Sequence, residues 1–501
     1  MLLALVGTLA SATVYLVSAR LVAGGWGYPL DDSWIHQTLA RNLVLYGEMA
    51  VNPGQPVAVS TAPLWTALLV PGYLLGVPPL PGESPTGQAG LPPFLWTHLV
   101  GGGSLVLLAW STFRLGRALL PQDSRVPWLA GLLMLVEWHL VWAALSGMET
   151  VLFATLSLAV LTEALAKRLT RPWLLGFLVG LMTLMRPEAI LLGPLLGAWA
   201  FFTVPSTRWT PLLAFGAALA LTILPVVGLN LVLSGSPLPA TFFAKNAAYG
   251  VGPDVRRYVQ YLVGAVIELG RGPLLLLYPG LIYGLARRFS GMAGAWHLPL
   301  AWCALLVGAY MVWLPALYHH GRYLFPLIPI VSLYGLEGGR LLLNRLPFVL
   351  LPRVAPVLLG LVVALSWARG AQVYAENVRY INEQQVALAL WARDNTSTEA
   401  VLATHDIGAM GYFSQRTLVD IAGLASPELV SSPKDISRIL GVLEEKGVDY
   451  IILLPEWYPP LYDALRADPR IQGVPRGSPG AETPSGARPF EILRRIRNES
   501  K

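Results

Sequence analysis

The sequence contains one cysteine in 501 residues, and charged side chains make up only 13% of it. Because Cys303 lies inside an apolar run, we expect neither a disulfide framework nor a cysteine metal site. Hydrophobic residues make up 54% of the chain, and the mean hydropathy is +0.56. This composition is too apolar for an ordinary soluble protein and is typical of repeated membrane spans. We therefore expect a polytopic α-helical membrane protein.

Twelve apolar runs are candidate spans, and they predict about 11–13 membrane crossings. Several runs, such as 62–77, are shorter than the ~20 residues needed to cross the hydrocarbon core. Such runs are expected to tilt, to pair or to re-enter. The runs lie at residues 2–22, 62–77, 94–113, 127–146, 149–166, 172–185, 188–204, 210–233, 272–286, 297–315, 322–338 and 348–367.

Basic residues gather in the gaps between these runs, which is how membrane orientation is encoded. Five clusters each lie two runs beyond the last, so we expect all five on the cytoplasmic side. With this parity, either the run 62–77 does not cross and is a re-entrant or membrane-surface helix, or the chain has one further span; its short length and Pro71 favour the first. The run 2–22 lacks a basic leader and a clean cleavage site, so we expect a retained signal anchor. A net charge of +6 distributed in this way does not predict nucleic-acid binding. The clusters are Arg114, Arg117 and Arg125; Lys167, Arg168 and Arg171; Arg208; Arg287 and Arg288; and Arg340 and Arg345.

The composition changes after Arg369, where charged residues become frequent. Val401–Thr404 and Tyr450–Leu454 are typical of short buried strands, whereas 382–393 and 434–446 are typical of helices. We therefore predict two domains, a membrane domain over 1–368 and a small extracytoplasmic α/β domain over 369–501. The Gly-, Pro- and Ser-rich stretch 473–489 is expected to be partly disordered.

Two adjacent aspartates, Asp31 and Asp32, lie in the loop 23–61 just after the first apolar run. Only four aspartates occur in the first 367 residues, so a pair beside the membrane requires a reason. One reason is capping of a helix over Ser33–Tyr46, for which one aspartate is enough. Another is general-base chemistry, in which a carboxylate takes a hydroxyl proton while cations from other outer loops stabilise a departing lipid phosphate.

Several motifs together resemble the C-type glycosyltransferase superfamily (GT-C), in its bacterial branch of terminal arabinofuranosyltransferases and polyprenyl-phosphate-mannose mannosyltransferases. They occur in order along most of the membrane domain. The Asp pair begins the set, and one departure is His36, where relatives often carry a small polar residue. The motifs are Asp31-Asp32-Ser33-Trp34-Ile35, Ala40-Arg41-Asn42-Leu43, Asn52-Pro53-Gly54, Ser60-Thr61-Ala62-Pro63-Leu64-Trp65, Ser146-Gly147-Met148-Glu149-Thr150, Arg186-Pro187-Glu188-Ala189, 239–245 and Arg322-Tyr323-Leu324-Phe325-Pro326.

The resemblance implies an inverting membrane transferase that moves a sugar from a polyprenyl phosphate to an acceptor hydroxyl on the outer face of a bacterial plasma membrane. The acceptor is a glycan, a lipid or a protein. Asp31 is the implied base, and Asp32 is implied to orient it, bind the sugar or help hold a divalent cation (Mg, Mn or Ca). Two aspartates alone make a thin site for such an ion. The alternative function is a lipid-linked sugar flippase or transporter, which predicts charges and broken helices within spans, and the sequence shows none clearly.

Other outer-loop residues are candidates with competing interpretations. Lys245 is expected either to bind the donor phosphate or to be an interfacial lysine. His319, His320 and Arg322 at a helix start either bind the phosphate or anchor the chain at the interface. A sugar-binding or network role is expected for His36, Arg41, Glu149, Arg186 and Glu188, although both glutamates can cap helices and Arg186 can pair with one of them. In the outer domain, His405 and Asp406 either touch the acceptor or cap local structure.

Overall fold

The computed structural model describes residues 2–76, 91–166, 170–203, 209–249, 254–288, 294–347, 350–429, 435–475 and 490–496. The chain divides into two compact units, which we call unit 1 and unit 2. Unit 1 comprises Met1–Ser18, His98–Val226 and Tyr249–Val373, and unit 2 comprises Ala19–Thr97, Val227–Ala248 and Tyr374–Lys501. The loop after the first helix therefore belongs to the same unit as the C-terminal sheet.

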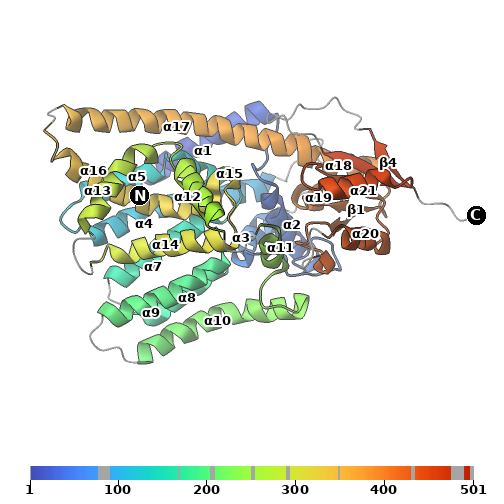
Figure 1. Ribbon diagram of the computed structural model, residues 1–501, viewed down its shortest axis with the longest axis horizontal. Helices are drawn as coiled ribbons and strands as arrows, with labels where there is room; N and C mark the ends of the chain where they lie inside the picture. Colours follow the sequence, from blue (N-terminus) through green and yellow to red (C-terminus); the bar gives the residue numbers. More distant parts are fainter. Residues whose placement is uncertain are drawn as a thin grey trace, which may run out of the picture. The chain divides into compact units, whose positions relative to one another are not determined.

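Each of the twelve predicted apolar runs contains helix in the structure (Figure 1). By length and composition, four helices of the described chain can cross a membrane, or six if each bent pair is one span. The count of 11–13 crossings and the orientation remain predictions; Lys167, Arg168 and Arg208 lie outside the described residues. The four are α1 (Leu2–Ala23), α4 (Leu91–Leu119), α10 (Trp209–Ser234) and the helix beginning with α17 (Leu351–Ile381); shorter apolar helices are α3 (Pro63–Leu74), α7 (Thr150–Ala166), α8 (Pro172–Thr183), η1 with α9 (Pro187–Leu191, Leu192–Thr203) and α14 (His297–Trp313).

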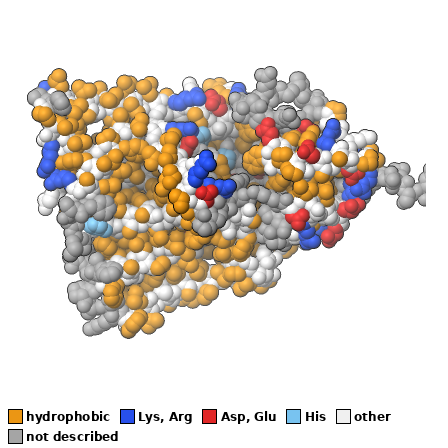
Figure 2. Space-filling model, viewed as in Figure 1, with side chains coloured by type: hydrophobic (Ala, Val, Ile, Leu, Met, Phe, Trp, Pro, Cys, Tyr) orange, Lys and Arg blue, Asp and Glu red, His pale blue; other side chains and the backbone are white. Residues whose placement is uncertain are grey.

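The surface of these helices is largely apolar. Exposed leucine, valine, phenylalanine and tryptophan side chains occur along them, and in Figure 2 hydrophobic side chains cover most of the visible face of unit 1. Residues that would be buried in a soluble protein are exposed here because lipid, like a protein core, is an apolar solvent. The predicted polytopic membrane fold is confirmed at this level.

The predicted span 127–146 is interrupted rather than continuous. It consists of α5 (Arg125–Met134) and α6 (Trp138–Leu145), which meet at a 47° bend. The Glu137 side chain accepts a hydrogen bond from Leu140 N–H at 3.1 Å and so caps α6. The expectation that no span is clearly broken is wrong at this position.

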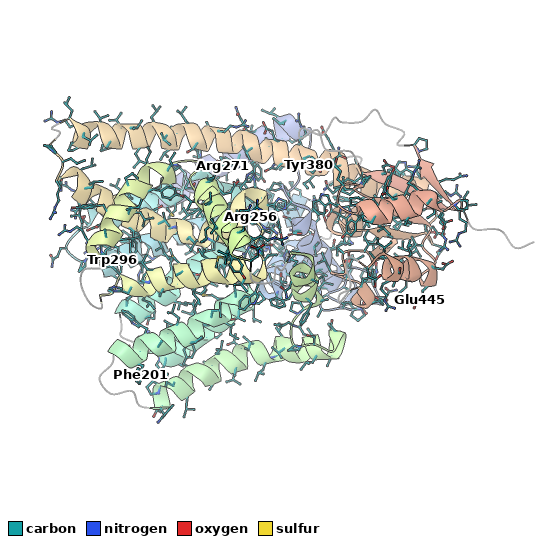
Figure 3. All side chains as sticks on the ribbon, in the orientation of Figure 1. Phe201, Arg256, Arg271, Trp296, Tyr380 and Glu445 are labelled. Atoms are coloured by element: carbon teal, nitrogen blue, oxygen red, sulfur yellow. The ribbon has the colours of Figure 1, made fainter. Side chains whose placement is uncertain are left out.

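Two helices of unit 1 pack closely through glycines. A Cβ on Gly280 of α13 (Leu274–Arg288) would lie 2.3 Å from the Gly335 carbonyl oxygen of α16 (Ile328–Leu343). Small residues allow such backbone approach, which drives helix association where the hydrophobic effect is absent. Before α13, α12 (Val255–Leu269) lies at a 119° bend, with Arg256 and Arg271 near its two ends (Figure 3).

Unit 2 contains a five-stranded sheet in the order β2-β1-β3-β5-β4. The three strands β1 (Val401–Thr404), β2 (Thr417–Asp420) and β3 (Tyr450–Leu453) are parallel, and β5 (Glu491–Arg495) is antiparallel to β3 and to β4 (Ile471–Val474). The predicted strands and both predicted C-terminal helices are confirmed, while 476–489 lies outside the described residues. The other elements are α2 (Asp31–Tyr46), α11 (Ala240–Tyr249), α15 (Tyr318–Gly321), η2 (Arg322–Leu327), η3 (Asn382–Val386), α18 (Ala387–Asn395), α19 (Gly408–Phe413), η4 (Pro427–Leu429), α20 (Ile436–Glu445) and α21 (Pro459–Ala467).

Candidate functional site

Asp31 is bound to the start of a helix in the C-terminal part of unit 2. Its two carboxylate oxygens accept hydrogen bonds from the backbone N–H groups of Gly408 and Ala409, each at 2.8 Å. These N–H groups begin α19 and have no partner within that helix. Burial, together with the nearby Asp406 carboxylate, raises the pKa of Asp31 well above its usual range, and the two N–H groups oppose this shift. Asp31 therefore joins two segments that are 377 residues apart.

The predicted capping of α2 by the aspartate pair is wrong. The helix begins at Asp31 rather than Ser33, so both aspartates lie in its first turn, and its cap residue Leu30 makes no side-chain capping bond. Asp31 caps α19 instead. A local sequence pattern cannot identify this partner because the capped helix is distant in the sequence.

Arg41, at the other end of α2, binds the far end of the same helix. Its guanidinium donates to the carbonyl oxygens of Tyr412 at 2.6 Å and Gly411 at 3.1 Å, and lies over the Tyr412 ring. A carboxylate at the N-terminus and a guanidinium at the C-terminus of α19 both complement its dipole. Trp34 fills the space between them by packing against Tyr412 and Phe413.

Asp32 has different surroundings from its neighbour. Its side chain is 30% exposed, and its Oδ2 lies 3.8 Å from the Lys245 ammonium nitrogen. Lys245 lies on α11, whose start is bound to the first loop: Ala240 N–H donates to the Ala58 carbonyl at 2.9 Å, and the Thr241 hydroxyl donates to the Val59 carbonyl. Unit 2 thus brings together one partly exposed carboxylate and one lysine that the sequence predicted separately.

His36 lies one turn after Asp32 on α2 and is buried. Its Nδ1 is 2.9 Å from the Thr66 hydroxyl of α3. On the same helix, Gln37 hydrogen-bonds to Thr97 at 3.0 Å and accepts from the Tyr73 hydroxyl at 2.7 Å. These contacts join α2 to α3 and α4, so His36 takes part in a buried hydrogen-bond network, while a sugar-binding role for it stays a prediction.

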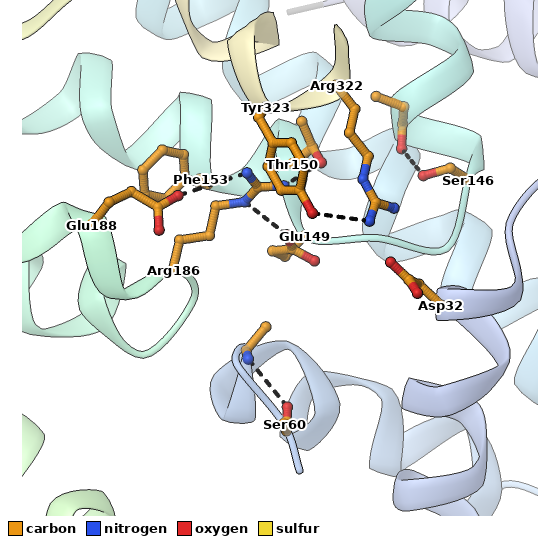
Figure 4. A network of polar contacts seen from close by, with 12 residues as sticks. Asp32, Ser60, Ser146, Glu149, Thr150, Phe153, Arg186, Glu188, Arg322 and Tyr323 are labelled. Carbon is orange, nitrogen blue, oxygen red and sulfur yellow. Dashed lines mark hydrogen bonds and ion pairs between the residues drawn. The ribbon is translucent and has the colours of Figure 1, made fainter. Parts of the chain in front are cut away.

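Unit 1 contains a second set of the predicted residues, centred on Arg186 (Figure 4). The buried guanidinium donates to Glu149 at 2.7 Å, to Thr150 at 3.1 Å and to the Tyr310 hydroxyl at 2.9 Å. Glu188 lies 3.7 Å from the guanidinium and also accepts from Tyr310. Removing one partner from such a buried charged network leaves the others uncompensated. Tyr310 is a member that the sequence did not suggest.

The predicted helix start is found at Arg322, which begins η2, but the two histidines before it are not helical. His319 and His320 have φ of 53° and 62°, and Gly321 has φ of 71°, so three successive residues are left-handed. Left-handed backbone costs about 1–2 kcal/mol for a residue with a Cβ. The His320 ring lies edge-on between Trp138 and Trp142, with both centroid distances 5.3 Å.

Arg322 follows this turn and begins the 3₁₀ helix η2. Its side chain is almost fully buried, its Nη2 lies 3.4 Å from the Tyr323 hydroxyl, and its guanidinium lies over the rings of Tyr318 and Tyr323. The arginine therefore lies buried among tyrosine rings within unit 1. A planar guanidinium is a group that can bind a phosphate.

Sequence reasoning missed two buried polar residues at the break between α5 and α6. His139 Nδ1 lies 2.7 Å from Glu137 Oε1, and both side chains are fully buried. His139 Nε2 is 3.2 Å from the Glu268 carbonyl oxygen. The signal was available, because a glutamate and a histidine two residues apart interrupt the apolar run 127–146.

His405 and Asp406 follow β1 in unit 2. His405 is buried, and desolvation lowers its pKa, which keeps the imidazole neutral. Asp406 accepts a hydrogen bond from Gln385 at 3.2 Å. Neither residue caps α19, whose first N–H groups bind Asp31. The expectation that His405 and Asp406 cap local structure is therefore wrong for this helix.

The aspartate pair does not fit a divalent cation. Both Asp31 oxygens are already bound to backbone N–H groups, and Asp32 is paired with Lys245 at 3.8 Å. Calcium and magnesium require several free oxygen ligands. Within the described residues, no group of three or more His, Cys, Asp or Glu side chains could hold a metal ion.

The fold is that of solved GT-C structures. ArnT from Cupriavidus metallidurans in the apo state matches with a TM-score of 0.63 and 15% identity, covering 97% of each chain. The same protein bound to undecaprenyl phosphate matches with a TM-score of 0.63 and 14% identity, over 98% of each chain. The oligosaccharyltransferase from Archaeoglobus fulgidus, in complex with Zn and sulfate, matches with a TM-score of 0.56 and 14% identity, covering 90% of this chain and 68% of that one.

Sequence comparisons give less. A domain family described only as a domain of unknown function, DUF8728, matches residues 376–487. No curated protein matches the sequence. The structural matches, together with the apolar helices, show an integral membrane protein with the GT-C fold, which confirms the fold expected from the sequence motifs.

Proposed function

We propose that this protein is a membrane glycosyltransferase that moves a sugar from a polyprenyl phosphate to an acceptor hydroxyl on the extracytoplasmic face of a bacterial plasma membrane. The observation that carries the proposal is the pairing of Asp32 with Lys245 in unit 2, at 3.8 Å. A carboxylate that accepts a hydroxyl proton and a cation that receives a phosphate are the two groups the reaction needs. The likeness to ArnT bound to undecaprenyl phosphate supports a polyprenyl donor.

Asp32 rather than Asp31 is the base in this proposal. A general base must reach the proton it removes, and Asp32 has a partly exposed carboxylate. Both oxygens of Asp31 accept backbone hydrogen bonds at 2.8 Å, so its role is to hold the first turn of α2 and thereby position Asp32. This assignment reverses the order that the family resemblance implies for the pair.

The reaction follows from these roles. Asp32 removes the proton of the acceptor hydroxyl, and the oxygen attacks the anomeric carbon from the face opposite the phosphate. The bond between the anomeric carbon and the phosphate oxygen breaks, and polyprenyl phosphate leaves with the electron pair. The configuration of the anomeric carbon is thereby inverted. Lys245 stabilises the negative charge on the departing phosphate. Arg322, with His319 and His320, stays a separate predicted phosphate-binding group within unit 1, where its guanidinium lies over the rings of Tyr318 and Tyr323.

Turnover by full-length protein in liposomes tests the proposal. Polyprenyl-phosphate mannose and polyprenyl-phosphate arabinofuranose are the donors that the resemblance implies, and release of polyprenyl phosphate is the readout. We expect Asp32→Asn to lower turnover by about 10²–10⁴-fold, the usual contribution of a general base. Asp463→Asn is the control, because Asp463 lies exposed on α21. Equal turnover by Asp32→Asn and the wild type would remove Asp32 from this role.

A second candidate, a transporter of lipid-linked sugars, is favoured by one observation. Glu137 and His139 are buried at the break of the α5–α6 span, and ionisable groups at broken helices are typical of transport sites. Movement of a labelled lipid-linked sugar between leaflets, without release of polyprenyl phosphate, would support transport. Loss of that movement in Glu137→Gln, with turnover absent throughout, would select it over the transferase.

A further inference from the structure

The parallel part of the C-terminal sheet has a topological switch point between two strands. From β1 the chain passes to β2 on one side, and it later returns to β3 on the other side of β1. In open α/β sheets, ligands bind at the carboxyl ends of the strands where the winding direction reverses. The carboxyl ends of β1 and β3 are therefore the place to look for a ligand in this domain.

Aromatic rings gather at this edge of the sheet. His405 follows β1, and its ring stacks on Phe490 with centroids 5.3 Å apart and planes within 9°. Trp457 and Tyr458, in the turn after β3, lie 5.3 Å and 5.5 Å from the same ring. Trp457 is 60% exposed, so one large ring of the group is available to a molecule in solution.

Buried polar atoms at the same edge lack hydrogen-bond partners. Within the described residues, neither ring nitrogen of His405 has one, although Nε2 lies 3.9 Å from Asp406 Oδ2. Gln385 donates through Nε2 to Asp406, while its buried Oε1 has no partner in the same part of the chain. Buried polar groups are normally satisfied, because each unsatisfied one costs about 1–3 kcal/mol.

Gln385 reaches this edge from an irregular helical turn. It lies in η3, a π-helical segment between α17 and α18. Single π turns occur often at functional sites, where the extra residue redirects a side chain. Three separate observations therefore point to the carboxyl ends of β1 and β3 as a binding site: the π turn that carries Gln385, the topological switch point, and the His405 ring, which has no hydrogen-bond partner among the described residues.

The charges at this edge exclude an anionic ligand. In nucleotide-binding sheets the helix N-terminus after β1 binds phosphate, but here the Asp31 carboxylate occupies the first N–H groups of α19. The side chains nearest the edge are also acidic: Asp406, with its side chain 21% exposed, and the buried Asp420 at the end of β2. A phosphate or carboxylate would be repelled, whereas a hydroxyl group can donate to the Asp406 carboxylate. The Asp420 oxygens already accept from the N–H groups of Ala422 and Ala425.

We propose that His405, Asp406, Gln385 and Trp457 form a binding site for a neutral sugar residue, which we call the edge site. The sugar stacks on the exposed Trp457 face, donates hydroxyl hydrogen bonds to Asp406, and supplies partners for Gln385 Oε1 and His405 Nε2. An amphipathic aromatic ring combined with a carboxylate and an amide offers both apolar and hydrogen-bonding contacts to a sugar. The edge site itself does not depend on the proposed function. That the bound sugar is part of the acceptor does rest on the proposed function.

Saturation-transfer NMR on the full-length protein in nanodiscs tests the edge site. The probes are methyl α-mannopyranoside, methyl α-arabinofuranoside and glucose 1-phosphate. We expect saturation of at least one methyl glycoside and not of the sugar phosphate. Trp457→Ala and Asp406→Asn should each reduce that signal at least fivefold. Trp173→Ala, which removes an exposed tryptophan from α8 in unit 1, should leave it unchanged.

Three outcomes would overturn the edge site: saturation of none of the methyl glycosides, stronger binding of glucose 1-phosphate, or full binding in Trp457→Ala. Asp32→Asn separates this inference from the proposed function, because it should lower turnover by about 10²–10⁴-fold and leave glycoside binding intact. If Asp32→Asn lowers turnover while Trp457→Ala still binds the glycosides, the transferase stands and the edge site fails. If Trp457→Ala loses binding and no variant shows turnover, the edge site stands and the transferase fails.

Discussion

A single methyl group at Gly408 should separate the first loop from the C-terminal sheet of unit 2. A Cβ at this position would lie 2.0 Å from the Asp31 carbonyl oxygen and 2.7 Å from its carboxylate Oδ2. Backbone must therefore move by more than 1 Å, which breaks the two bonds from Gly408 and Ala409. A buried hydrogen-bonding group left without its partner costs about 1–3 kcal/mol. We expect Gly408→Ala to destabilise unit 2 by about 3–5 kcal/mol.

Gly411→Ala is the matched control, because it makes the same change in the same helix. A Cβ there would meet only the side chains of Val51 and Thr38, at 3.3–3.5 Å, and alanine favours helix. The assay is hydrogen exchange with mass spectrometry on full-length protein in nanodiscs, following peptides from α2 and α19. Gly408→Ala should increase exchange in both helices, and Gly411→Ala in neither. Equal exchange in the two variants would refute the argument that Asp31 holds these helices together.

Two further results are expected. Burial raises the pKa of Asp420 to about 7, above its unfolded value, and raises that of Asp31; the folded state then binds more protons, so stability present below about pH 4 should be lost as pH rises towards 7. The protein should therefore unfold at a lower temperature at pH 8 than at pH 5, and this difference should be smaller in Asp420→Asn. An unfolding temperature that rises from pH 5 to pH 8 would contradict the argument. His319→Gly should raise the unfolding temperature by removing about 1–2 kcal/mol of left-handed strain. Turnover should fall in the same variant, and a gain in both would show that the imidazole has no part in the site.

The positions of the apolar helices could be predicted, because apolar runs are a local signal. Each predicted run contains helix, whereas whether 62–77 crosses stays a prediction, because α3 and α8 both have 12 residues. The break at Glu137 was not predicted, because the apolar residues on both sides dominate the average hydropathy of the run. The buried Glu137 carboxylate is bound by the start of α6 and by His139, and both partners are visible only in the structure. The left-handed turn at His319 was missed because left-handed backbone is uncommon for histidine.

The candidate site was predicted by residue type better than by role. The motifs identified Asp31, Asp32 and Lys245, but nothing near Asp31 shows that its partners are the N–H groups of Gly408 and Ala409. Arg41 likewise binds the carbonyls of Gly411 and Tyr412 in α19. Such pairings depend on tertiary structure. A single sequence therefore does not distinguish a carboxylate that anchors a helix from one that takes a proton.

The bond between Asp31 and Gly408 also sets an order of events during biosynthesis. Asp31 leaves the ribosome 377 residues before its partner, which at elongation rates of 5–20 residues per second is a delay of roughly 20–75 s. Throughout that interval the first loop has no helix to bind. The nascent chain should therefore gain an ordered first loop only once translation has passed α19, and a product truncated upstream of that helix should reach the bilayer without it.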